Sequence, residues 1–169
     1  MRTNLSVLVG LALMATSACG KGKAPEQPRP APSLLVEMRA VEDDAFLLAD
    51  NAPLFTDSLT KIVRDTIEWK EIWTQAMSRR PADARLARPV IDFSKEMVAL
   101  AAAGRLKLGD VVHIDSVGTR KELTVIVLRY TIGCQDLRQT AYPFEMAKLP
   151  RTTGEVTWRE HRNKAPECQ

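Results

Sequence analysis

The chain has 169 residues, a formal net charge of +3, and 27% charged residues. Its lysines and arginines are scattered among acidic residues, and aromatic residues make up only 5% of the chain. A nucleic-acid-binding surface needs a basic stripe or stacking aromatics, so nucleic acid is excluded as the expected partner. Once the N-terminal segments described next are set aside, roughly 115–130 residues remain, which suffice for one hydrophobic core.

Residues 1–18 have the pattern of an export signal. Arg2 supplies a cationic start, residues 5–15 form an apolar run, and small residues precede Cys19. The run is too short to span a bilayer, which takes about 20 apolar residues. We therefore expect residues 1–18 to be a signal peptide that is removed on maturation, and the protein to be exported.

Cys19 and the small residues before it resemble the lipobox of bacterial lipoproteins, in which the cysteine is diacylated and becomes the first residue. Thr16 stands where the lipobox usually has an aliphatic residue. The same residues also suit the cleavage site of a secreted or periplasmic soluble protein, so both alternatives stay open. Lipidation at Cys19 predicts a protein that acyl chains hold on a membrane of the cell envelope.

Residues 20–32 are rich in proline, glycine and charge and have no apolar period. Such a composition is typical of an extended linker. Residues 19–33 are therefore predicted to be the lipidated cysteine and a flexible tether, and residues 34–169 to be a single globular domain.

The first elements of this domain are two strands and one helix. Residues 34–41 favour a strand, and Leu59, Ile62 and Val63 favour an edge strand. Asp65, followed by Glu68 three positions on, has the spacing of a helix N-cap. Apolar residues then recur at helical spacing, and Arg79, Arg80 and Pro81 are expected to end the helix. The apolar residues are Ile67, Trp69, Ile72, Trp73, Ala76 and Met77. We expect Trp69 and Trp73 to be core residues instead of a ligand clamp, because large aromatic side chains drive burial.

The stretch 89–104 predicts a central strand and its entry. Asp92 and Ser94 flank Phe93 and are expected to turn the chain locally, and residues 97–103 form an apolar run that suits a strand buried on both faces. Residues 110–117 alternate between apolar and polar side chains, so a hairpin is predicted to join them to that run.

The rest of the chain predicts strands in series. Residues 123–130 are rich in β-branched side chains, residues 139–149 are interrupted by Pro143, and residues 155–159 form a last strand. The predicted class is α+β, a mainly antiparallel β-sheet or sandwich with one amphipathic helix packed on it.

Cysteine usage supports export. If Cys19 is acylated, Cys134 and Cys168 remain, an even number in an oxidising compartment. A disulfide between them would hold the end of the chain against a turn of the sheet. Two free buried thiols, or an unpaired cysteine in the tail, remain the alternatives.

Several of these segments occur in an order that suggests a family. They are the helix with Trp69 and Trp73, residues 89–98, Gly104, the strand at 111–114 and residues 142–151. In this order they resemble the PrcB C-terminal domain family, which is named after an accessory lipoprotein of a bacterial surface protease complex. The resemblance covers about residues 58–160. It implies a small, β-rich, exported accessory or binding domain, and it offers no established catalytic residues to carry over to this chain.

Members of that family commonly carry a Thr-Gly-Gly-Tyr-like loop after the glycine, which is similar to the loops by which small β-sandwich inhibitors approach proteases. In this chain the corresponding place lacks the paired glycines and the tyrosine. The candidate interaction loop consists of Leu106, Lys107, Leu108, Gly109 and Asp110.

Catalysis is not expected. Ser94, His113 and Asp115 supply the side-chain types of a nucleophilic triad, but no nucleophile elbow is present. The spacing of cysteines and of the two histidines does not suit zinc, and no phosphate-binding motif is found, so no metal and no cofactor are predicted.

The favoured interpretation is a non-catalytic, envelope-anchored accessory protein that binds another exported protein, such as a protease, through a strand edge or a loop. Two alternatives remain: a periplasmic carrier of a small apolar ligand, and a hydrolase that uses Ser94.

Overall fold

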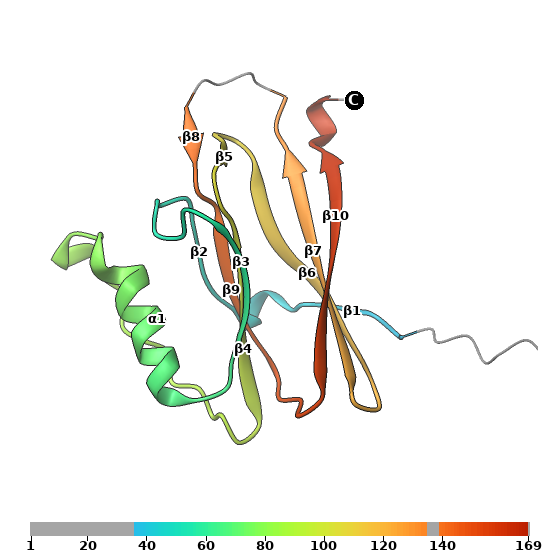
Figure 1. The fold of residues 1–169 in the computed structure, drawn as a ribbon. Helices are drawn as coiled ribbons and strands as arrows, with labels where there is room; N and C mark the ends of the chain where they lie inside the picture. Colours follow the sequence, from blue (N-terminus) through green and yellow to red (C-terminus); the bar gives the residue numbers. More distant parts are fainter. Residues whose placement is uncertain (1–35, 135–138, 169) are drawn as a thin grey trace, which may run out of the picture. The chain divides into compact units, whose positions relative to one another are not determined.

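The computed structural model describes residues 36–134 and 139–168 (Figure 1). The predicted signal peptide, the lipidation site at Cys19 and the tether lie outside the described residues, so they stay predictions. Within the described part of the chain, no helix is long and apolar enough to cross a membrane.

The described residues form ten strands, one α-helix and three 3-10 turns. The helix is α1 (Thr66–Ser78), and the turns are η1 (Asp43–Ala45), η2 (Ala82–Ala84) and η3 (Pro166–Cys168). The strands are β1 (Arg39–Ala40), β2 (Phe46–Asp50), β3 (Ser58–Val63), β4 (Glu96–Ala103), β5 (Leu106–Lys107), β6 (Val111–Arg120), β7 (Leu123–Ile132), β8 (Thr140–Ala141), β9 (Phe144–Pro150) and β10 (Glu155–Lys164).

These strands pair into two four-stranded sheets and one short pair. Sheet A has the order β1-β6-β7-β10, sheet B has the order β2-β9-β4-β3, and β5 pairs with β8. Every pairing is antiparallel except that of β7 with β10, which is parallel. The α+β class and the mainly antiparallel pairing are therefore confirmed.

Helix α1 begins where the sequence predicts. The Asp65 carboxylate accepts hydrogen bonds from the backbone N–H groups of Ile67 and Glu68, at 2.9 Å each. The exposed fractions of Trp69 and Trp73 are only 1% and 5%, which confirms them as core residues. Ile67 was predicted on the apolar face, but it is 75% exposed because it lies in the first turn, on the solvent side.

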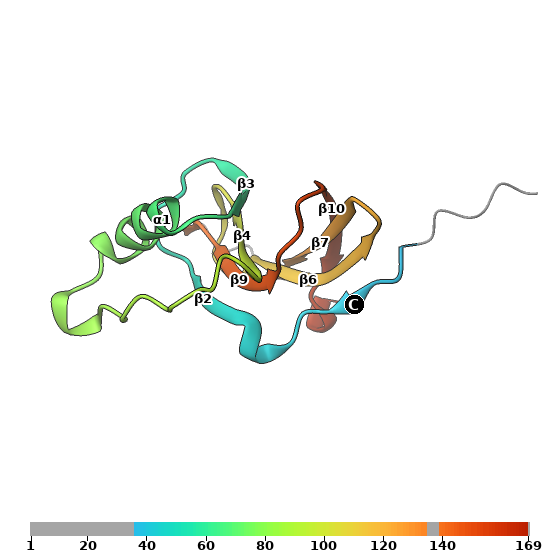
Figure 2. The ribbon, with the colours of Figure 1, turned by 90° about the horizontal axis from the view of Figure 1, so that it is seen from below.

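The central strands of sheet B, β4 and β9, are buried on both faces, with α1 on one side and sheet A on the other (Figure 2). Val98, Leu100 and Ala102 of β4 share a hydrophobic cluster with the tryptophans of α1. The alternate residues Met97, Ala99 and Ala101 share a second cluster with apolar residues of β6 and β7 in sheet A. Strand β4 lies between β9 and β3, so the predicted central strand is confirmed.

The predicted hairpin between residues 97–103 and 110–117 is wrong. Strand β4 belongs to sheet B and β6 belongs to sheet A, so the chain changes sheets between them. Gly104, at φ +70, makes the change possible, because a Cβ there would lie 2.7 Å from the backbone nitrogen of Ser58. The predicted strand at 34–41 is also shorter in the described residues, where only β1 (Arg39–Ala40) is extended and paired.

Candidate functional site

Strand β10 is a long edge strand of sheet A (Figure 1). It pairs with β7 over ten consecutive register positions, from Glu155 to Lys164, and in the described residues no strand pairs with its other edge. None of its residues is fully buried, and the last six, Arg159 to Lys164, are all exposed. The strand therefore offers an accessible row of backbone hydrogen-bonding groups.

The pairing with β7 determines which backbone groups of β10 are free. The N–H of Ala165 donates to the carbonyl oxygen of Ile132 at 2.9 Å, which continues the ladder just beyond the strand. Backbone groups alternate between the two sides of a strand. The N–H and C=O groups that point to the open edge accordingly belong to Val156, Trp158, Glu160, Arg162 and Lys164.

The first residues of β10 are positioned by the turn before it. The Arg64 guanidinium donates to the carbonyl oxygens of Thr152 and Gly154, at 3.4 and 3.5 Å. Gly154 lies so close to the hairpin between β6 and β7 that a Cβ there would be 1.7 Å from the carbonyl oxygen of Glu122. Only glycine fits this contact without movement of the backbone.

Replacing Gly154 by alanine is expected to lower the free energy of unfolding by about 1–3 kcal/mol, because the added methyl group forces two backbone segments apart. Urea unfolding followed by circular dichroism measures this change. Thr153→Ala, at an exposed position of the same turn, is the control and should leave the free energy of unfolding almost unchanged. An unchanged midpoint for Gly154→Ala would contradict the close contact.

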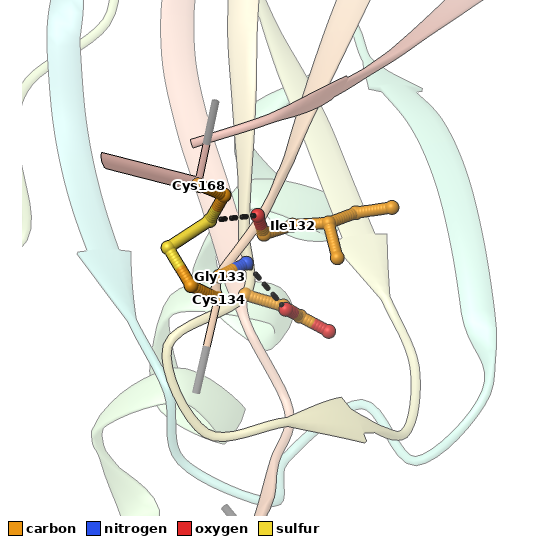
Figure 3. Close-up of a disulfide and its surroundings, with 5 residues drawn as sticks. Ile132, Gly133, Cys134 and Cys168 are labelled. Carbon is orange, nitrogen blue, oxygen red and sulfur yellow. Dashed lines mark hydrogen bonds between the residues drawn. A yellow bond between two sulfur atoms is a disulfide. The ribbon is translucent and has the colours of Figure 1, made fainter. Parts of the chain in front are cut away.

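The last residues of β10 are held by a disulfide (Figure 3). Cys134 follows β7 and Cys168 ends η3, and their Cα atoms are 5.1 Å apart. The sulfur of Cys168 lies 3.8 Å from the carbonyl oxygen of Ile132, beside the ladder bond to Ala165. The predicted pairing is confirmed, and it joins the end of β10 to the end of its neighbour β7.

The candidate interaction loop lies next to this disulfide. Leu106 and Lys107 form β5 and pair with β8, and the N–H of Leu108 donates to the carbonyl oxygen of Gln139. Asp110 is buried, and its carboxylate accepts the N–H of Lys107 at 3.3 Å and the N–H of Gly133 at 3.0 Å. Asp110 therefore fixes the loop to the end of β7, and Lys107 and Gly109 are its exposed residues.

Tyr130 connects β7 with the inner side of β10. Its hydroxyl donates to the Glu160 carboxylate at 3.4 Å, and the Arg162 guanidinium lies 4.8 Å from the centre of its ring. Burial raises the pKa of the Tyr130 hydroxyl above its usual value, and the negative charge of Glu160 raises it further. The fold thus favours the neutral phenol.

Because this pKa is raised in the folded state, the stabilising contribution of Tyr130 is complete below the usual tyrosine pKa of 10.0 and is lost as the pH rises through the folded value. We expect Tyr130→Phe to cost at most about 1 kcal/mol at neutral pH. We also expect the variant to lose less stability than the wild type between neutral pH and about pH 11. Urea titrations at both pH values test this, and equal losses would contradict it.

The side chains of His113 and Glu145 meet between the two sheets. The side chain of Glu145, on β9, is 8% exposed, and one of its carboxylate oxygens lies 3.1 Å from Nδ1 of His113, on β6. The other oxygen accepts the backbone N–H of Ile114 at 2.6 Å. The His113 ring also packs on Phe46 at 4.9 Å. The side chain of His113 is 33% exposed, so it is partly open to solvent and partly held between the sheets.

The three side chains considered for a hydrolase do not meet. Ser94 donates to the Asp92 carboxylate in the turn before β4, and this hydrogen bond is the main cause that lowers the pKa of Asp92. His113 pairs with Glu145, and Asp115 pairs with Arg129 at 3.0 Å. The predicted local turn at Asp92 and Ser94 is confirmed.

A surface hollow of about 530 Å³ lies beside His113. Charged and polar side chains line much of it, including Asp50, Asn51, Arg129 and Glu145. Among the described residues, no three or more histidine, cysteine, aspartate or glutamate side chains are grouped closely enough to hold a metal ion.

The sequence did not indicate either the length of β10 or the role of Glu145. A strand at 155–159 was predicted, but β10 continues to Lys164 because each residue pairs with β7. The signal for Glu145 was a single acidic residue inside an apolar strand, Phe144 to Leu149. Comparison with protein-family models, with curated proteins and with solved structures finds no match to this chain.

Proposed function

We propose that the protein is an exported bacterial lipoprotein, anchored to the cell envelope through Cys19, that serves as a non-catalytic accessory or binding subunit for another exported protein, such as a protease. The observation that carries this proposal is the open edge of β10, which is exposed over six consecutive residues. An exposed sheet edge binds an extended segment of a partner by adding it as a further strand. The resemblance to the PrcB C-terminal domain family supports the same function.

The two ends of β10 support its use as a binding edge. Gly154 and Arg64 position its start, and the disulfide of Cys134 with Cys168 holds its end. A strand that is already ordered pays less conformational entropy when a partner binds. The disulfide also suits an exported protein, because disulfides persist in oxidising compartments.

The place where the chain enters the domain also supports this function. The N-terminal described residues lead into β1, which is one edge of sheet A, and β10 is the opposite edge of the same sheet. The described residues that enter the domain therefore pair at the edge opposite to β10 and do not occupy the β10 edge. We further propose that sheets A and B form a β-sandwich, since their facing residues share one hydrophobic cluster.

The alternative of a carrier for a small apolar ligand receives less support. Such a site is lined mainly by apolar side chains. The hollow beside His113 is instead lined by several charged groups, and the apolar residues between the sheets pack against one another.

Crosslinking in native envelopes tests the proposal. A photo-reactive amino acid replaces Thr157 or Arg159 on β10 of the full chain, and Lys70, exposed on α1, is the control position. We expect one exported protein to be captured from β10, not from Lys70, and to be lost in a Cys19→Ala chain. Capture of nothing above background from β10 would overturn the proposal.

A further inference from the structure

We propose that the open edge of β10 binds an acidic, extended segment of the partner, which becomes a fifth strand of sheet A. This inference rests on the proposed function and specifies the chemistry of the partner. It is carried by three features of β10: its charge, the regularity of its pairing, and a basic hollow at its end.

The exposed half of β10 is basic. It carries Arg159, Arg162 and Lys164, together with His161, against a single acidic residue, Glu160. Arg162 lies 3.3 Å from Glu160, so that carboxylate already has a cationic partner. Arg159 and Lys164 have no ion-pair partner within the described part of the chain. The edge therefore has uncompensated positive charge that an acidic segment can neutralise.

The pairing of β10 is regular over its whole length. All ten residues are in register with β7, with no bulge, and the strand contains no proline. Bulges, prolines and short length are common means by which proteins prevent strand addition at an edge, and charge is another. Of these means, β10 has only its charge. Positive charge disfavours the addition of an apolar or a basic strand, but it leaves the backbone groups of β10 available to an acidic strand.

The same charge argues against a second copy of this chain as the occupant. Two β10 strands paired with each other would bring two sets of basic side chains together, and like charges opposite each other destabilise strand pairs. An acidic segment has the reverse effect, since its carboxylates would lie beside Arg162 and Lys164 on one face and Arg159 on the other.

A hollow of about 500 Å³ at the end of β10 extends the basic surface. Its lining residues are Arg129, Thr131, Arg162, Asn163, Lys164 and Pro166. Arg129 is opposite His161 in the register of the two strands, which brings a further cation beside β10, although it is paired with Asp115. The hollow has the size and charge to hold acidic side chains at one end of the added segment.

A fluorescent peptide of five Thr-Glu repeats, with blocked ends, tests the inference on the full chain purified in detergent. We expect the peptide to bind, and a matching Thr-Lys peptide not to bind. The glutamates of this peptide all lie on one face when it is extended, and Arg159 and Lys164 lie on opposite faces of β10. The double variant Arg159→Glu with Lys164→Glu should therefore weaken the binding about tenfold, since an attraction becomes a repulsion whichever face the glutamates occupy. The control variant Lys70→Glu with Arg88→Glu reverses two exposed charges elsewhere and should leave the affinity unchanged.

Amide hydrogen exchange separates strand addition from simple attraction between charges. We expect the bound Thr-Glu peptide to slow the exchange of the N–H groups of Trp158, Glu160 and Arg162, which point to the open edge. Binding without this protection, equal binding of the Thr-Lys peptide, or self-association that protects the same groups without peptide would each overturn the inference.

The two experiments fail independently. If β10 captures an exported protein in envelopes but the Thr-Glu peptide does not bind, the proposed function stands and the acidic-segment inference is wrong. If the peptide binds and protects the edge but envelopes yield no partner, the edge has the inferred preference and the proposed function is wrong.

Discussion

Replacing Cys134 and Cys168 by serine lowers the free energy of unfolding by about 3–4 kcal/mol. The two cysteines are 34 residues apart in the chain, so their disulfide removes the entropy of a loop of that length from the unfolded state. For a domain of this size the loss lowers the melting temperature by roughly 10 °C. The effect should be largest at the end of β10, where the disulfide joins two neighbouring strands.

The variant is best studied in a chain with Cys19→Ala, so that no other thiol is present. Urea unfolding with and without a reductant gives the measurement: reduction should destabilise the parent chain and leave the double variant unchanged. Hydrogen exchange should show faster opening at Asn163 and Ala165, whose N–H groups face β7. Equal stability of parent and variant would mean that the disulfide contributes nothing to the fold.

The elements that depend on local signals are the ones that the sequence predicts well. Helix α1 has its N-cap at Asp65 and an apolar face, and both act within a few residues. Strand β4 was predicted because residues 97–103 are apolar throughout, as suits a strand covered on both faces. The interruption of the strand at Pro143 was also predicted, because proline has no backbone N–H to donate to a neighbouring strand.

The pairing of distant strands could not be predicted from one sequence. Strand β10 follows β9 directly in the chain but pairs in parallel with β7, in the other sheet. A turn after β9 would have suited a hairpin equally well, and nothing in residues 151–154 indicates the change of sheet. The open edge of β10, and with it the candidate binding site, became visible only once that pairing was known.

The contact of Glu145 with β6 was hidden for a similar reason. One acidic residue in an apolar strand indicates either a solvent-facing position or a buried pair, and the sequence does not name the partner. Its partners, His113 and Ile114, lie about thirty residues earlier in the chain. Only the packing of sheet B against β6 brings them together.

Glu145→Ala is the second substitution with a large expected effect. The variant leaves the N–H of Ile114, a fully buried residue, without its acceptor and removes the partner of His113. A buried donor without a partner costs about 1–3 kcal/mol, and loss of the contact with His113 adds to this. We expect the free energy of unfolding to fall by roughly 2–4 kcal/mol.

Two further variants make this expectation specific. Glu145→Gln keeps an acceptor for Ile114 and can donate to a neutral His113, so it should cost only about 1 kcal/mol. Glu96→Ala removes a carboxylate on the neighbouring strand β4 whose pair with Lys148, at 3.3 Å, is partly exposed, and it too should cost at most about 1 kcal/mol. Urea unfolding of all three variants gives the comparison. If Glu145→Ala were no more harmful than Glu96→Ala, the contacts of Glu145 with His113 and Ile114 would not be what joins the two sheets at β6 and β9.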